Sequence, residues 1–186
     1  MTNFDIDDCL KSMQIIVDTR EQPSKRAQRR YEGFCVPYKR QTLSYGDYTY
    51  NFQLPDGQML FNDSDTIKGH VVVERKQDLV ELSQCFCQSR DRFEREFERA
   101  KENNATIYLL VEDASWENLI NGKYSTKFNS KAFFASITAW MARYDIKIIF
   151  CKSEISGKMI KEILYRELKE RLEKGEYDEK VNIECD

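Results

Sequence analysis

The chain has 186 residues, of which 41% are hydrophobic and 12% aromatic, and this composition excludes overall disorder and predicts one compact domain. Its formal net charge of -3 gives no general attraction to nucleic acid or to an anionic membrane, so either partner would have to meet a local basic patch. Six scattered cysteines and a single histidine argue against a structural zinc site and favour reduced thiols inside the cell. No basic, apolar signal opens the chain, and no apolar run approaches the roughly 20 residues needed to cross a bilayer.

The first half of the chain predicts two strands, a helix and a hairpin. A strand at residues 14–19 is followed by a short basic helix at residues 23–31, which can begin with its proline. Alternating aromatic and polar residues at 48–54 predict a hairpin with its turn at residues 55–58. The strand that follows, residues 69–76, ends on three consecutive charges: Glu74, Arg75 and Lys76.

The second half alternates helices with strands. Apolar residues at three- and four-residue steps predict a long helix at residues 78–103, and Asp78 and Glu81 at its start have capping-box spacing. The nearly continuous apolar run at residues 105–112 predicts a strand buried on both faces at the centre of a sheet. The chain is completed by a helix, a strand and a last helix, at residues 130–144, 145–151 and 153–173.

Strands that alternate with helices indicate an α/β fold, with a mixed central β-sheet flanked by helices and the hairpin as its antiparallel part. A single domain is expected over residues 1–186, with its core at about 13–165, because no repeat, low-complexity tract or linker divides the chain. The C-terminal helix is expected to end near residue 173, and the last dozen residues are expected to fray.

The charges at the end of the 69–76 strand are candidate functional residues, because a buried carboxylate needs a metal, a substrate or a counter-charge. Asp47, which follows Gly46, begins the strand that leads through the hairpin toward Glu74. Two nearby carboxylates favour a hard cation such as Mg²⁺, whose waters can be polarised for attack on a phosphodiester. Lys76 points to the same face as Glu74 and could orient that water. Alone, the pattern is short, and a solvated strand end or an ordinary ion pair is the commoner explanation.

Three motifs in order make the pattern more specific: VDTRE at residues 17–21, GDY at 46–48 and VVVERK at 71–76. Together they resemble the nuclease domain of the XPF family of structure-specific endonucleases. The resemblance continues through SRDRF, IYLLVE and IKIIF and covers most of residues 13–165. Since the chain carries none of the glycine-rich turns of the helix-hairpin-helix module that XPF relatives usually add, it is expected to be a stand-alone bacterial or phage-like version.

The resemblance implies a restriction-endonuclease-like core that cleaves DNA near branches or junctions with Mg²⁺ or Mn²⁺, in repair, recombination or replication. Matching motif positions imply Asp47 and Glu74 as metal ligands, with catalytic residues Asp18, Arg20, Asp47, Glu74, Arg75 and Lys76; Glu21 is a weaker candidate. The family normally places an acid four residues beyond the lysine, where this chain has Val80. Asp78 and Glu81 are the nearest acids, and helix capping is the preferred role for both.

Basic residues suggest how an acidic protein could hold DNA. Arg90 stands at helical steps from three phenylalanines, which predicts an inward position where it meets a site carboxylate, a substrate phosphate or a structural ion pair. The basic run from Arg20 to Arg40 predicts a patch that tracks phosphates. Arg92, by contrast, alternates with glutamates and is expected on a solvated face. The candidate DNA-binding residues are therefore Arg20, Arg26, Arg29, Arg30 and Arg90.

Two other functions remain open at this point. One is a catalytically silent XPF-like module that binds DNA or a protein partner as a scaffold, and the other is a nuclease that acts on DNA ends with the same site. The aromatic stripe of Phe133, Ile137, Trp140 and Met141 is core by default, although part of it could form a homodimer interface of the kind the family uses. The expected location is the cytoplasm, or the host cytoplasm if a phage encodes the chain.

Overall fold

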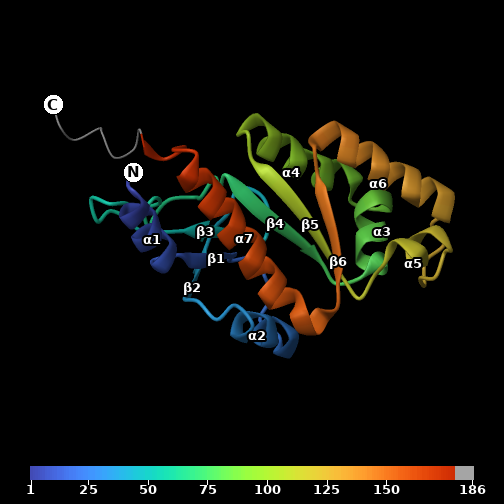
Figure 1. Ribbon diagram of the computed structural model, residues 1–186. Coiled ribbons are helices and arrows are strands. Elements are labelled where there is room, and N and C mark those ends of the chain that lie inside the picture. The colour runs from blue at the N-terminus through green and yellow to red at the C-terminus, as the bar shows by residue number, and fades with distance from the viewer. Residues whose placement is uncertain (179–186) are drawn as a thin grey trace.

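A six-stranded mixed sheet in the order β2-β1-β3-β4-β5-β6 forms the centre of the protein (Figure 1). The computed structural model describes residues 1–178. The strands are β1 (Gln14–Asp18), β2 (Tyr38–Gln41), β3 (Tyr48–Asn51), β4 (Val71–Lys76), β5 (Thr106–Glu112) and β6 (Lys147–Cys151). The helices are α1 (Asn3–Lys11), α2 (Lys25–Glu32), α3 (Leu79–Cys87), α4 (Arg90–Glu102), α5 (Trp116–Ile120), α6 (Ser130–Tyr144) and α7 (Ser156–Glu173), with a 3-10 turn at Ser153–Ile155.

Strand β3 supplies the antiparallel part of the sheet, as predicted. It runs antiparallel to both β1 and β4, whereas the pairs β1–β2, β4–β5 and β5–β6 are parallel. The predicted turn at residues 55–58 is present, since the Leu54 amide donates to the Gln58 carbonyl at 2.7 Å. The returning arm of this hairpin pairs only through an isolated bridge between Gln53 and Met59. The mixed sheet flanked by helices is confirmed.

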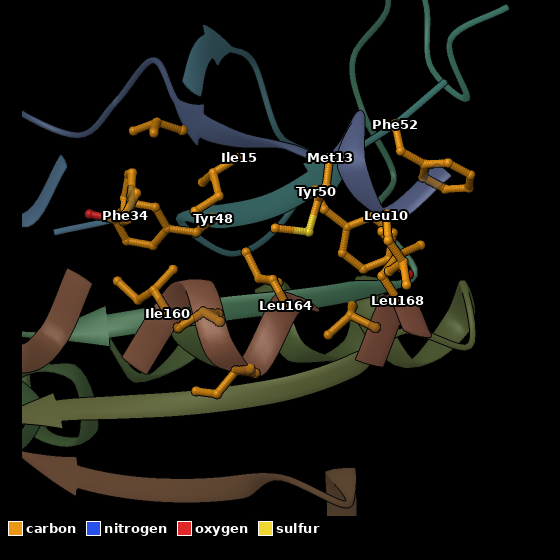
Figure 2. Close-up of a cluster of buried hydrophobic side chains, with 14 of the residues drawn as sticks. Leu10, Met13, Ile15, Phe34, Tyr48, Tyr50, Phe52, Ile160, Leu164 and Leu168 are labelled. Atoms are coloured by element: carbon orange, nitrogen blue, oxygen red, sulfur yellow. The ribbon is translucent and has the colours of Figure 1, made fainter. Parts of the chain in front are cut away.

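Two apolar cores lie on the two faces of the sheet. Successive side chains of β4 point to opposite faces, so β4 contributes to both cores. Val71 and Val73 pack in the core that α1, α2 and α7 cover, whereas Val72 packs in the core that α3, α4 and α6 cover. Figure 2 shows the first core, where Ile160, Leu164 and Leu168 of α7 lie beneath the side chains of β1 and β3. Because side chains alternate along a strand, Glu74 and Lys76 continue the face of Val72 and Arg75 continues the opposite face.

The prediction of one long helix at residues 78–103 is wrong, because the helix is interrupted between α3 and α4. Ser89 has φ -123° and ψ 26°, and the amides of both Gln88 and Ser89 donate to the Gln84 carbonyl, which closes α3. The bend brings three phenylalanines onto Trp140: the ring centroids of Phe86, Phe93 and Phe97 lie 4.9, 5.0 and 5.2 Å from its own. Burying this aromatic cluster offsets the helical hydrogen bonds that the break removes.

Residues 1–11 and 175–178 are better ordered than the sequence predicts. Helix α1 was not predicted, although Thr2 and Asp5 form a capping box at its start. Tyr177 is buried and its hydroxyl lies 2.7 Å from that of Tyr50, so residues 175–178 are packed rather than frayed. The remainder of the predicted frayed tail, residues 179–186, lies outside the described residues.

Most of the stripe on α6 is core, as expected. Phe133, Ile137 and Trp140 are at most 2% exposed, whereas Met141 is partly exposed. No helix among residues 1–178 is both long enough and apolar enough to cross a membrane.

Candidate active site

The end of β4 buries a carboxylate and an ammonium side by side. Glu74 is 4% exposed and Lys76 is 8% exposed, and the Lys76 Nζ forms a salt bridge with Glu74 Oε1. Among residues 1–178, the other carboxylate oxygen, Glu74 Oε2, is buried without a hydrogen-bond partner. A buried polar atom of this kind is costly unless a ligand satisfies it, which makes the end of β4 a candidate binding site.

Asp47 is held next to this pair by the turn that precedes β3. Gly46 has φ +72°, and a Cβ at this position would lie 2.8 Å from the Val72 Cβ, so only glycine fits. The Gly46 amide donates to Glu96 Oε1 at 3.0 Å, which ties the turn to α4. The Asp47 amide donates to the Val73 carbonyl at 3.0 Å, and Asp47 Oδ2 accepts from the Arg75 amide at 2.8 Å. These bonds fix Asp47 beside Glu74, at the start of the neighbouring strand β3.

A cavity of about 250 Å³ lies over these residues. Five of its lining residues, all from the α3–α4 region, were not predicted: Cys85, Ser89, Arg92, Phe93 and Glu96. Four of them recur at steps of three and four along one side of α4, and this spacing was the signal available in the sequence. The predicted lining residues are Arg20, Asp47, Glu74 and Lys76.

Burial is the main cause that raises the pKa values of both carboxyl groups. Burial raises the pKa of Glu74 to about 7, against the opposing effect of Lys76. Burial, with the nearby charge of Glu74, raises the pKa of Asp47 well above its usual range. Burial alone would lower the pKa of Lys76, but the charges of Glu74 and Asp47 raise it overall. The ammonium therefore stays protonated, and the two carboxylates gain from any further cation.

The residues present fit a hard divalent cation. Asp47 and Glu74 offer oxygen ligands, and the unpartnered Glu74 Oε2 is a ready acceptor of metal charge. Within residues 1–178, no group of three or more acidic, cysteine or histidine side chains is close enough to hold an ion. Two carboxylates would therefore have to be completed by water or substrate oxygen, which is how Mg²⁺ is usually bound.

Asp18 and Arg20 act as a pair, but only Arg20 reaches the cavity. Asp18 is fully buried, and its carboxylate accepts from Arg20 Nε at 2.8 Å, from an Arg20 terminal nitrogen at 2.9 Å and from the Leu43 amide at 2.9 Å. The Arg20 side chain is 48% exposed and lines the cavity. Asp18 therefore orients the guanidinium, and Arg20 meets whatever binds there.

Arg75 lies on the other face of the sheet from Glu74 and Lys76. Its guanidinium is 3.5 Å from Glu21 Oε1 and 3.6 Å from Glu112 Oε2, and it does not line the cavity. The structure therefore brings together Arg20, Asp47, Glu74 and Lys76, and separates Arg75 from them.

The same buried ion-pair network takes up much of the predicted basic patch. Arg30 is 3% exposed, donates to Glu112 Oε1 at 3.1 Å and lies 3.3 Å from Glu21 Oε2. Arg26 is partly exposed and forms ion pairs with both Glu112 and Asp113. The prediction that Arg30 contacts DNA phosphates is therefore wrong, because its guanidinium is buried on the face of the sheet opposite the cavity. Arg29, on the same helix, is exposed.

The inward position predicted for Arg90 is wrong, whereas Arg92 is exposed as expected and also lines the cavity. Arg90 is exposed and does not line the cavity. The inward prediction for Arg90 assumed one continuous helix, and the break at Ser89 shifts the register of the face that meets the site. Asp78 and Glu81 serve the start of α3, as expected: Asp78 accepts from the Glu81 amide at 2.8 Å, and Glu81 Oε2 accepts from the Gln77 amide at 2.7 Å.

Comparison with known proteins places this chain in a family. The sequence model of the ERCC4 domain family matches residues 17–163 of this chain. The fold is similar to that of XPF from Aeropyrum pernix, with a TM-score of 0.59 and 17% identity over 88% of this chain and 69% of that one. XPF from Aeropyrum pernix in complex with DNA is similar too, with a TM-score of 0.57 and 19% identity over 86% of this chain and 66% of that one. No curated protein matches in sequence. The chain therefore belongs to the ERCC4 domain family and has the fold of the XPF-family nuclease domain.

Proposed function

We propose that the protein is a metal-dependent DNA endonuclease that cleaves branched or junction DNA in repair, recombination or replication in the cytoplasm. The observation that carries the proposal is the buried, unpartnered Glu74 Oε2 beside Lys76 and Asp47 in an open cavity. A silent scaffold has no need of such a costly group. The ERCC4 match and the fold shared with a DNA-bound XPF support DNA as the substrate.

Each side chain has a distinct part in this mechanism. Asp47 and Glu74 would hold Mg²⁺ or Mn²⁺, which supplies Lewis-acid stabilisation of the phosphate and a lowered pKa for bound water. Lys76, which stays protonated, orients the attacking water and offsets charge that develops on the phosphate. Arg20, held by Asp18, places a second positive charge at the cavity. Arg75 is proposed to support the end of β4 from the opposite face.

The decisive test is cleavage of a panel of DNA structures: flap, fork, four-way junction, linear duplex and single strand, with Mg²⁺, Mn²⁺ or EDTA. We expect internal cuts near the branch point that require the metal. Loss of nucleotides from linear ends would instead show an end-acting nuclease, and binding without cleavage of any substrate would show a silent scaffold.

Asp47→Asn is expected to weaken Mn²⁺ binding, because a neutral amide removes charge where a hard cation needs it. The amide oxygen can still accept from the Arg75 amide, so the turn should keep its shape. Calorimetric titration with Mn²⁺ measures the loss, and Asp56→Asn in the exposed 55–58 turn is the matched control. Equal affinities for the two variants would remove Asp47 from the metal site.

We propose that the exposed basic residues Arg29 and Arg90 and the partly exposed Arg26 track DNA phosphates outside the cavity, and that Arg20 does so at the cavity itself. Replacing Arg29 and Arg90 with Gln should weaken binding uniformly across sequences. The slope of log affinity against log salt should fall by roughly 0.9 for each lost duplex contact. Lys131→Gln, an exposed change on α6, is the control. Isotherms that overlay those of the control at every salt concentration would exclude both arginines.

We also propose a homodimer, on a surface other than the predicted α6 stripe. Phe134 is 38% exposed and Ile120 is 51% exposed, beside Trp116 and the Phe150 ring of edge strand β6. An exposed aromatic group next to an unpaired strand edge suits self-association. Sedimentation at several protein concentrations would give the mass of the assembly.

A further inference from the structure

The cavity at the end of β4 contains charges of both signs that do not pair with each other. In the described part of the chain, Glu74 Oε2 has no hydrogen-bond partner although it is buried. Arg92 of α4 lines the same cavity, yet among residues 1–178 its guanidinium has no ion pair or hydrogen bond. The carboxylate oxygen can bind a cation and the guanidinium can bind an anion. The cavity therefore suits a ligand that carries both charges, such as a phosphate with its bound cation.

Arg92 differs in this respect from the other cations of the cavity. Arg20 is committed to Asp18 through two nitrogens, and Lys76 is committed to Glu74. The guanidinium of Arg92 keeps all its donors and has the planar geometry that matches two phosphate oxygens. Ser89, one helical turn earlier, also lines the cavity, and its hydroxyl does not cap α4.

We propose that Arg92, with the hydroxyl of Ser89, binds the DNA phosphate that enters this cavity, so that α4 supplies the anion-binding wall and β4 the acidic wall. The break between α3 and α4 is what makes this wall, because it turns Ser89 and Arg92 toward the end of β4. The inference rests on the proposed function for its substrate, and it adds a binding residue that the order of charges in the sequence does not reveal.

The test compares Arg92→Gln with Arg95→Gln, a matched change on the same helix of an exposed arginine that has no partner among residues 1–178. Binding of a junction DNA is measured in EDTA at several salt concentrations, so that cleavage plays no part. We expect Arg92→Gln to weaken binding about tenfold or more and to lower the salt slope by roughly 0.9, while Arg95→Gln binds as the wild type does. Arg92→Lys should restore the slope but only part of the affinity, since the ammonium lacks the planar fork.

A structural role is distinguished by thermal unfolding, because exposed Arg92 should leave the Tm of both variants unchanged. Equal affinity and equal salt slope for Arg92→Gln and Arg95→Gln would overturn the proposal. A wild-type protein that binds junction DNA but cuts none would defeat the proposed function alone, since the binding comparison still decides the role of Arg92. A wild-type protein that binds no DNA would overturn both.

Discussion

Glu74→Gln should lower the rate of DNA cleavage by about 10²–10³-fold or more, because it removes a charge that the proposed mechanism requires. The amide has nearly the same shape as the carboxyl group, so the fold should persist. Lys76→Met should have a similar effect on the rate, and its unbranched side chain can keep the packing on Phe93, whose ring centroid lies 5.0 Å from the Lys76 Nζ. Glu98→Gln, an exposed change on α4, is the control for both.

Glu74→Gln should also change how the free energy of unfolding depends on pH. Burial raises the pKa of Glu74 to about 7 from its usual 4.5, so the folded protein binds a proton more tightly than the unfolded chain does. This contribution is fully present below about pH 4.5 and is lost as the pH rises through about 7. The free energy of unfolding of the metal-free protein should therefore fall across this window, and Mn²⁺ should restore it at the upper end.

Urea unfolding between pH 4.5 and 8 measures this dependence. In Glu74→Gln the fall should be smaller, because the amide does not titrate, and Mn²⁺ should restore less stability. Identical pH profiles for the variant and the wild type would show that Glu74 does not titrate in this window. Near-normal turnover in either Glu74→Gln or Lys76→Met would exclude the proposed catalytic roles.

Arg30→Gln should destabilise the fold by about 3–5 kcal/mol, because it breaks the buried ion pairs of Arg30 with Glu112 and Glu21. For a chain of this length the loss corresponds to a fall in Tm of about 6–20 °C. Arg29→Gln, its exposed neighbour on α2, should change stability by at most about 0.5 kcal/mol. Thermal unfolding of the two variants tests the assignment. An unchanged Tm for Arg30→Gln, together with weaker DNA binding, would return Arg30 to the DNA surface.

The contrast between these two arginines shows where sequence reasoning stops. In the sequence Arg29 and Arg30 are equivalent members of one basic run, and nothing local indicates that Arg30 is enclosed. Its partners, Glu21 and Glu112, stand 9 and 82 residues away in the chain. A buried ion pair between distant elements leaves no periodic pattern, so the run was interpreted as a solvated patch.

Other parts of the fold could be predicted because their signals are local. The helix at residues 130–144 has its predicted bounds, and β1, β4 and β5 lie within their predicted ranges. Helix α5 was missed because five residues are too few to establish a period. The break at Ser89 was missed because neither glycine nor proline marks it, and the packing that favours it comes from Trp140, far along the chain.

Asp47, Glu74 and Lys76 were placed correctly in the cavity because their motifs sit at strand ends, where alternation fixes the face. The same alternation already separated Arg75 from its neighbours, although the resemblance grouped all three. Arg92 and Glu96 could not be ranked above the other charges of α4 without knowing the direction of the bend.

Because side chains alternate between the two faces along β4, neighbouring positions of this strand should tolerate substitution for different reasons. Under the proposed function, Glu74 and Lys76 are constrained by catalysis, whereas Arg75, which faces the buried ion-pair network, is constrained by folding. A protein that loses Arg75 could be rescued by stabilising substitutions elsewhere, because stability contributions from distant sites add. Loss of Glu74 or Lys76 has no such remedy. Neighbouring positions in one motif would thus differ in whether second-site suppressors exist.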